Sequence, residues 1–213
     1  MVHFPPQLKA LLDAARHKHV DKNQVLLYQG DSVNEVLYLA EGVIKMYDID
    51  DAGNEKILHI FKSPAFVPLA LFSNRDVVTR WFYASLTECD VAAVNRDELD
   101  ELYQRDPETA AYLMHWYSRE VHEILTRLNS LSKTLARDKI IAALKHFATF
   151  HVHATRGRWY NVTFPVTHQF LADFTGVSRE STTACLHDLQ AEKLIKMPAQ
   201  STLQINRNKL FKD

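Results

Sequence analysis

The sequence predicts an α+β protein whose first half is built from strands and whose second half is mainly helical. Short alternating apolar and polar runs follow one another from about residue 24 to residue 95. A long helical pattern follows Pro107, and beyond residue 136 the helices are short and lead to a final pair of strands. With 213 residues, the chain fits one or two domains.

The N-terminal part begins with helical spacing over residues 7–18, which places Leu8, Leu11 and Leu12 on one face. From residue 24 the apolar period changes to two in the runs VLLYQG, VLYLAEGVIKMYDI, EKILHIF and WFYASLTECDVAAVN. Turn sequences rich in Gly, Asp and Asn separate these runs. Many short strands at regular spacing favour a barrel or sandwich, so a β domain is expected over residues 1–106.

The long helix is expected over residues 107–136, with Pro107 in its first turn, where a missing N–H has no consequence. Its apolar residues recur at alternating steps of four and three, which is the seam of a coiled coil. Polar residues beside the seam, among them Glu120, Glu123 and Arg127, favour a partner helix over packing on the chain's own barrel. A homodimer is therefore expected. Its interface residues would be Met114, Tyr117, Val121, Ile124, Leu128, Leu131 and Leu135.

The C-terminal part, residues 137–213, has the element order of a winged helix-turn-helix. An amphipathic helix over residues 136–150 precedes a hairpin, RGRWYNVTFPVT, with its turn around Gly157. Two short helices are expected at about 168–174 and 179–191, followed by a strand pair from Ile195 to Ile205.

The helix pair carries the residue pattern that a helix-turn-helix needs. Gly176 can adopt positive φ in the turn, and the Ser178 hydroxyl can cap the second helix. The residues expected to face inward are Phe170, Leu171, Ala172, Phe174, Val177, Leu186 and Leu189. The residues expected to face outward are Arg179, Glu180, Thr182, Thr183 and His187.

In such a motif the N-terminal residues of the second helix enter the major groove of DNA. There an Arg can donate two hydrogen bonds to guanine, and a Glu can accept one from the cytosine amino group. The expected base-reading residues are Arg179, Glu180, Thr183 and Ala184. The expected phosphate contacts are Thr167, His168, Gln169, Ser178 and Ser181.

Charge is distributed unevenly along the chain, although the net charge is only −1. Residues 1–135 carry 14 Lys and Arg against 20 Asp and Glu, whereas residues 136–213 carry 11 against 6. A basic C-terminal part is typical of a region that meets a polyanion, here double-stranded DNA.

These motifs together resemble the Crp/Fnr family of bacterial transcription regulators, and the resemblance covers essentially the whole chain. The segment TxxxLAxxxGVSRExxxxxLxxLxxxxLI, from Thr167, is the DNA-binding signature of that family, and QGD at 29–31 and LAEG at 39–42 match its β-roll turns. The resemblance implies a β-roll (jelly roll) of the cyclic-nucleotide-binding type. It also implies a dimer on a palindromic operator and control through the N-terminal domain. Family members usually recruit RNA polymerase, which favours an activator, but the residues themselves leave activator and repressor open. The loop at 48–55 and the hairpin around 155–161 match surfaces through which family members touch polymerase.

The chain departs from the cAMP-binding members of the family at the pocket motif. Pro68-Leu69 stand where those members have Gly-Glu, and Thr79-Arg80 stand where they have Arg-Ser. An apolar wall is a poor site for a charged phosphate, so cAMP binding is not expected. The residues that would line a pocket for another effector are Phe66, Pro68, Leu69, Leu71 and Arg80. An unidentified small molecule and a domain that serves only as scaffold both remain open.

No cofactor or metal is expected. The N-terminal helix lacks the cysteines that an iron–sulfur sensor needs, and the two cysteines, Cys89 and Cys185, have no metal-ligand spacing. His59, His115 and His122 are the candidates for a haem ligand, but each is better explained as a packed or solvated histidine.

The recognition helix also departs from the cAMP receptor protein, because Ala184 stands where that protein has a second base-reading Arg. A methyl group can contact only a thymine methyl, so this chain should have an operator of its own.

The rival hypothesis is a ligand-binding module whose C-terminal domain docks to protein. The polar outward face of the recognition helix favours DNA instead. No catalytic constellation can be assembled, so an enzyme is not expected. Neither a signal peptide nor a membrane span is evident, so a cytoplasmic protein with no membrane partner is expected.

Overall fold

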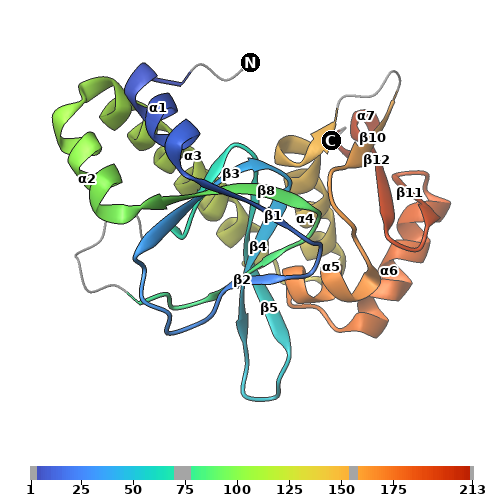
Figure 1. Cartoon of the computed structure of the whole chain (residues 1–213). Coiled ribbons are helices and arrows are strands. Elements are labelled where there is room, and N and C mark those ends of the chain that lie inside the picture. Colours follow the sequence, from blue (N-terminus) through green and yellow to red (C-terminus); the bar gives the residue numbers. More distant parts are fainter. Residues whose placement is uncertain (1–3, 70–77, 154–157, 212–213) are drawn as a thin grey trace. The chain divides into compact units, whose positions relative to one another are not determined.

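The computed structural model describes residues 4–69, 78–153 and 158–211 (Figure 1). The chain divides into two compact units, each described here by itself. The first comprises Met1–Asp48 and His59–His122, and the second comprises Ile49–Leu58 and Glu123–Asp213. Within the described ranges, no helix combines the length and the apolar character that a bilayer-spanning segment needs.

The first unit is built around two four-stranded sheets, which confirms the expected β domain, although the last residue of β4 and the first four of β5 fall in the segment Ile49–Leu58 of the second unit. One sheet has the order β1-β8-β3-β6 and the other the order β2-β7-β4-β5. Its apolar core includes Leu39, Ile44, Phe61, Phe66 and Tyr83. The strands are β1 (Arg16–Val20), β2 (Val25–Leu27), β3 (Glu35–Glu41), β4 (Val43–Ile49), β5 (Glu55–Lys62), β6 (Ala65–Val67), β7 (Phe82–Ser85) and β8 (Cys89–Asn95).

Gly42 makes the tight turn between β3 and β4. Its φ of +106° lies in the region that residues with a side chain rarely adopt. A Cβ added at this position would lie 2.5 Å from the carbonyl oxygen of Glu88, so the turn also requires the absence of a side chain.

Two helices flank the strands of this unit and differ from the expectation. The first helix, α1 (Pro6–Ala14), was expected to reach residue 18, but Arg16–Val20 forms β1. The polar residues of β1 pair antiparallel with β8, from Arg16↔Ala93 to Val20↔Cys89, and sheet hydrogen bonding overrides the local helical pattern. The second helix, α2 (Arg96–Arg105), was not expected, although the Asn95 side chain caps it by accepting from the N–H of Asp97 at 2.8 Å.

The long helix α3 (Pro107–Leu131) begins at Pro107 as expected and ends four residues before Leu135. Leu135 is instead the residue that precedes the next helix, and it is 63% exposed. The buried stripe of α3 comprises Thr109, Leu113, Trp116, Glu120, Glu123 and Arg127.

The expected arrangement of charges on α3 was wrong at three positions. Glu120, Glu123 and Arg127 were expected to lie beside the seam for a partner helix, but all three are buried in the other stripe of α3. Polar partners explain this burial: the Glu120 carboxylate lies 2.9 Å from Nε2 of His59. Much of the apolar seam remains accessible, with Met114 46% and Leu128 61% exposed.

The second unit contains the expected winged helix-turn-helix. Its helices are α4 (Ala136–Phe150), α5 (His168–Thr175), α6 (Arg179–Ala191) and the short α7 (Arg207–Leu210). Its sheet has the order β11-β12-β10-β9, formed by β9 (Val152–His153), β10 (Trp159–Val162), β11 (Ile195–Ala199) and β12 (Thr202–Asn206). Phe147, Phe164, Phe170 and Phe174 form the aromatic centre of its core. The predicted hairpin turn around Gly157 lies outside the described residues.

Candidate nucleic-acid interface

The turn between α5 and α6 has the local geometry that the sequence predicts. The Thr167 hydroxyl caps α5 by accepting from the N–H of Phe170 at 3.0 Å. Gly176 ends α5 in the left-handed conformation, with φ of +65°. Ser178 then caps α6, its hydroxyl accepting from the N–H of Ser181 at 3.2 Å. These local signals fix where each helix begins and ends.

The inner face of α6 differs from the expectation at one residue. Thr182 was expected to face outward, but it is fully buried. It lies three, four and seven residues before Cys185, Leu186 and Leu189, which is the spacing of one buried helical face. Phe170, Leu171, Ala172 and Phe174 are buried on α5 as expected, and Val177 between the helices is half-buried.

The outer face of α6 carries the four predicted base-reading residues. Arg179, Glu180 and Ala184 are exposed, and Thr183 is half-buried. Oγ1 of Thr183 lies 3.0 Å from Nδ1 of His168, so this side chain is oriented by α5. An exposed Arg and Glu therefore stand on the first turn of a helix whose opposite face is held in the core.

The predicted phosphate-contacting residues fall into two groups. Ser178 and Ser181 are exposed at the start of α6, where their hydroxyls are 3.0 Å apart. The other three line a hollow of about 690 Å³. Its lining is Thr167, His168, Gln169, Arg179, His187, Gln190, Met197, Pro198, Ala199 and Gln200. The described residues thus bring Arg179 and three predicted phosphate-contacting residues around one concave surface.

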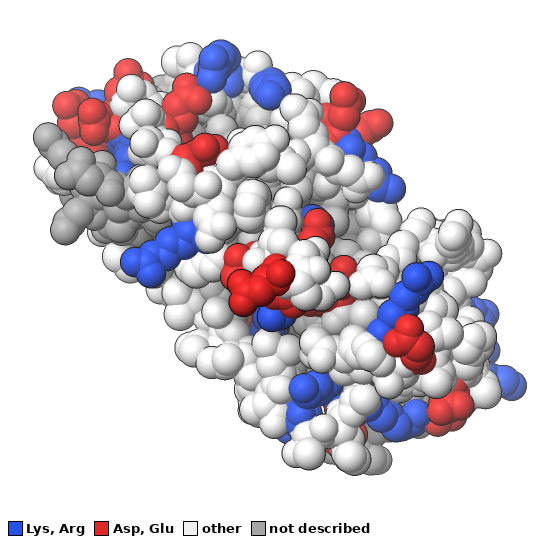
Figure 2. All heavy atoms as spheres, turned by 90° about the horizontal axis from the view of Figure 1, so that it is seen from below, with Lys and Arg blue, Asp and Glu red and all other residues white. Residues whose placement is uncertain are grey.

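The sequence analysis did not include the end of β11 or the turn that follows it in the interface. Met197–Gln200 reaches the same hollow as Arg179, and the signal for it was only a Pro-Ala-Gln-Ser turn sequence. Figure 2 shows, on the face that it presents, Lys and Arg side chains interspersed with Asp and Glu rather than gathered into a single basic field.

The predicted effector-pocket residues have different surroundings in the first unit. Phe66 is buried, with its ring 5.2 Å from that of Tyr38 and 5.3 Å from that of Trp116. Pro68 is buried and Leu69 is half-buried. Arg80 is exposed, and its carbonyl accepts from Nε2 of Gln29 at 3.0 Å. Leu71 lies outside the described residues. The neighbours of Phe66 are thus the chain's own aromatic rings.

The three histidines considered as haem ligands differ in burial. His115 and His122 are exposed on α3. His59 is fully buried, with Nε2 2.9 Å from Glu120 and its ring 4.6 Å from that of Phe61. A carboxylate and an aromatic ring therefore pack against His59.

Comparison with protein families matches both units. Residues 17–106 match the model of the cyclic nucleotide-binding domain, and residues 138–211 match that of the Crp-like helix-turn-helix domain. Together these matches cover more than half of the chain.

Curated relatives include the HTH-type transcriptional regulator ArcR of Staphylococcus haemolyticus, which is 25% identical over 84% of this chain and 78% of its own. The probable transcriptional regulator flp of Lacticaseibacillus casei is 23% identical over 94% of this chain and 88% of its own.

Solved structures share the fold. FixK2 from Bradyrhizobium japonicum superposes with a TM-score of 0.77 at 16% identity, covering 92% of this chain and 96% of its own. The c-di-GMP responsive global regulator CLP from Xanthomonas campestris has a TM-score of 0.74 at 20% identity, covering 93% of this chain and 97% of its own. The order of the two matched domains and the capped helix pair agree on one conclusion: this chain belongs to the Crp/Fnr family of DNA-binding transcription regulators.

Proposed function

We propose that this regulator binds a palindromic operator as a homodimer and reads each half-site through Arg179 and Glu180. The observation that carries the proposal is the placement of these two exposed side chains on the first turn of α6, while Thr182, Leu186 and Leu189 anchor the opposite face. A helix held in this way presents its N-terminal residues to the major groove.

Each outward residue of α6 has a role that its chemistry supports. Arg179 donates two hydrogen bonds to guanine, and Glu180 accepts from the cytosine amino group. Thr183, oriented by His168, and the methyl group of Ala184 accommodate an A·T pair beside them. The phosphate contacts come from Thr167, His168, Gln169, Ser178 and Ser181, which position the protein without specifying the sequence.

The dimer forms along the apolar seam of α3. Met114 and Leu128 are exposed there, and Tyr117, Val121, Ile124 and Leu131 are half-buried. Exposed Leu and Met at heptad spacing favour a second helix, because burying them removes apolar area from water. A two-fold dimer places its two recognition helices about 34 Å apart, one turn of DNA.

The β unit is the domain through which the regulator is controlled, and it does not bind cAMP. Pro68 and Leu69 replace the pocket glycine and carboxylate, and Phe66 packs against Trp116. Control therefore comes from another small molecule, or the domain acts as scaffold.

The protein acts in the cytoplasm as an activator that touches RNA polymerase. One contact surface is the acidic loop at 48–55, between β4 and β5. The Asp50 carboxylate orders this loop by accepting from the N–H of Asn54 at 2.9 Å.

Operator selection from random duplexes, followed by footprinting, tests the proposal. The selected site should be two-fold symmetric, with half-sites one helical turn apart. Arg179→Ala should weaken binding by about 5- to 150-fold and relax the preference at one base pair, because one bidentate base contact is lost.

Arg16→Ala is the matched control, because Arg16 is an exposed arginine of the β unit whose Nη2 bonds Glu35 at 3.0 Å. Its operator affinity should equal that of the wild type. A selected site without symmetry, or an Arg179→Ala protein that binds the operator as tightly as wild type, would overturn the proposal.

A further inference from the structure

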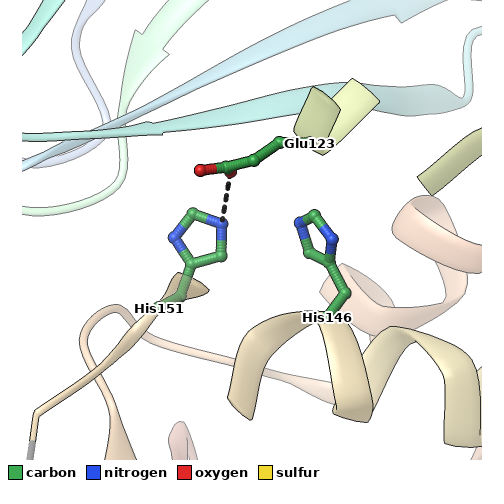
Figure 3. A group of neighbouring side chains, drawn as sticks. All are labelled: Glu123, His146 and His151. Atoms are coloured by element: carbon green, nitrogen blue, oxygen red, sulfur yellow. Dashed lines mark ion pairs between the residues drawn. The ribbon is translucent and has the colours of Figure 1, made fainter. Parts of the chain in front are cut away.

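Three ionisable side chains of the second unit converge on one point in its interior (Figure 3). Glu123 extends from α3, His146 from the last turns of α4, and His151 from the residue directly after α4. Each offers one ligand atom, and these atoms all lie within 4.8 Å of one another. The predicted DNA-reading residues are on other elements, so the cluster is separate from them.

The local structure explains why the two histidines face the same point. His151 ends α4, with its N–H donating to the carbonyl of Phe147 at 2.8 Å, and its φ of −126° and ψ of 35° turn the chain out of the helix. That turn brings its ring to 5.4 Å from the ring of His146, although the two residues are not one helical turn apart.

The cluster is enclosed by aromatic rings. Phe150 lies 4.9 Å and Phe174 5.8 Å from the His146 ring, and Phe164 lies 5.6 Å from the His151 ring. Exposed fractions are 8% for Glu123, 3% for His146 and 1% for His151. In such surroundings a carboxylate is costly to bury unless a cation accompanies it.

Two cationic or ionisable side chains of the second unit lie near this carboxylate. Nε2 of His151 is 3.9 Å from the Glu123 carboxylate, which is ion-pair range but longer than a hydrogen bond. Arg127, one helical turn along α3, donates to the carbonyl oxygens of Ile57 and Phe174 and stacks 4.3 Å above the Phe174 ring. The guanidinium is thus engaged by main-chain oxygens. An ion is favoured by the geometry of the cluster, whose three ligand atoms all lie within 4.8 Å of one another.

We propose that Glu123, His146 and His151 bind one divalent transition-metal ion, with zinc as the best match. Two imidazoles and one carboxylate are a ligand set that zinc accepts, with a water molecule in the fourth position. Zinc–ligand bonds of about 2.0–2.2 Å place neighbouring ligand atoms about 3.3 Å apart in a tetrahedron. Small side-chain rotations close the present separations to that value. This inference goes beyond the proposed function and does not depend on it.

Metal binding here has a structural consequence that can be measured without DNA. Glu123 belongs to α3, whereas both histidines come from α4 and its end. An ion held by all three ties these helices together in the folded state only. By mass action, the thermal midpoint must then rise with zinc concentration.

The experiment uses the full-length protein with any affinity tag removed, stripped of metal with a chelator and then dialysed. Zinc is titrated by calorimetry, and bound metal is counted by elemental mass spectrometry. The wild type should hold one more zinc per chain than His151→Gln or Glu123→Gln, and zinc should raise its thermal midpoint. His17→Gln is the matched control, because His17 is an exposed histidine of the other unit, and it should bind as the wild type does.

Cobalt spectroscopy of the unaltered protein keeps the inference testable if the variants fail to fold. One equivalent of Co²⁺ should give the intense visible bands of a four-coordinate ion, and zinc should displace them. Weak bands typical of six-coordinate surface cobalt would overturn the proposal, as would equal zinc stoichiometry in the wild type and a folded His151→Gln variant. A thermal midpoint that responds to pH but not to zinc would also overturn it. The cluster would then be an ion pair between Glu123 and His151 that binds no metal.

Discussion

Nη2 of Arg127, near the end of α3, donates a 2.7 Å hydrogen bond to the carbonyl oxygen of Phe174 in α5. The same nitrogen donates to the carbonyl of Ile57 in β5. Burial lowers the pKa of this guanidinium to about 10. One buried cation thus links α3, strand β5 and α5, the first helix of the helix-turn-helix.

Arg127→Ala should destabilise the protein, because it leaves two buried carbonyl oxygens without their donor. Hydrogen bonds from a charged donor contribute about 1.5–3 kcal/mol, and relief of the buried charge offsets part of the loss. We expect a decrease of about 2 kcal/mol in the free energy of unfolding, measured in urea. Arg119→Ala on the same helix is the control, since Arg119 is half-exposed and its pair with Glu120 contributes little. Equal losses in the two variants would contradict the role given to Arg127.

Leu128→Glu should separate the proposed dimer. Leu128 is 61% exposed on the seam of α3, and a carboxylate there meets its own copy across the two-fold axis. Losing two buried leucines of about 1.5 kcal/mol each weakens the dimer by about 100-fold or more. Sedimentation velocity over a dilution series gives the dissociation constant. Asn129→Glu adds the same charge one residue away, at an exposed position, and should leave the dimer intact. A Leu128→Glu protein that is still dimeric would show that this seam of α3 is not the dimer interface.

The pair of His19 and Asp90 should show in the pH titration of His19. Nδ1 lies 2.8 Å from the Asp90 carboxylate, and that hydrogen bond raises the pKa of His19 above 6.5. Stability from a raised histidine pKa is present below the unfolded value and is lost as pH rises through the folded value. NMR titration of the imidazole protons should give a midpoint above 6.5 that falls in Asp90→Asn. A midpoint unchanged by Asp90→Asn would show that the Asp90 carboxylate does not cause the raised pKa of His19.

Gly42→Ala should destabilise the protein more than Gly53→Ala. Both glycines have positive φ, +106° and +82°, so each substitution carries strain of about 1–2 kcal/mol. Only at Gly42 does the added Cβ also collide, at 2.5 Å from the Glu88 carbonyl, whereas nothing lies within 4 Å of a Cβ at Gly53. Thermal unfolding of the two variants gives the comparison. If Gly53→Ala lost as much stability as Gly42→Ala, backbone strain alone would explain both.

The helix-turn-helix was predictable because its signals are local. Thr167, Gly176 and Ser178 each act within three or four residues, so the bounds of α5 and α6 follow from the sequence. Thr182 was misplaced because threonine is polar enough for either face. Its true position follows from its spacing to Leu186 and Leu189 and not from its own chemistry.

The helix α3 carries two interleaved stripes, and the sequence identified only the apolar one. Met114 and Leu128 were placed on the seam from their hydrophobicity. The buried stripe contains Glu120, Glu123 and Arg127, whose burial depends on His59, His151 and the carbonyls of Ile57 and Phe174. Partners so far away along the chain leave no periodic signal, and β1 was missed for the same reason, since it depends on pairing with β8.

The sequence by itself determined the family, the order of the β domain, the long helix and the helix-turn-helix, and the exposed Arg179 and Glu180, because caps, turns and apolar periods act over a few residues. The tertiary structure alone decided which face of α3 is buried and where Glu123, His146 and His151 meet. The physical reason is that a buried charge is tolerated only where folding brings distant partners to it, and no local pattern encodes that meeting.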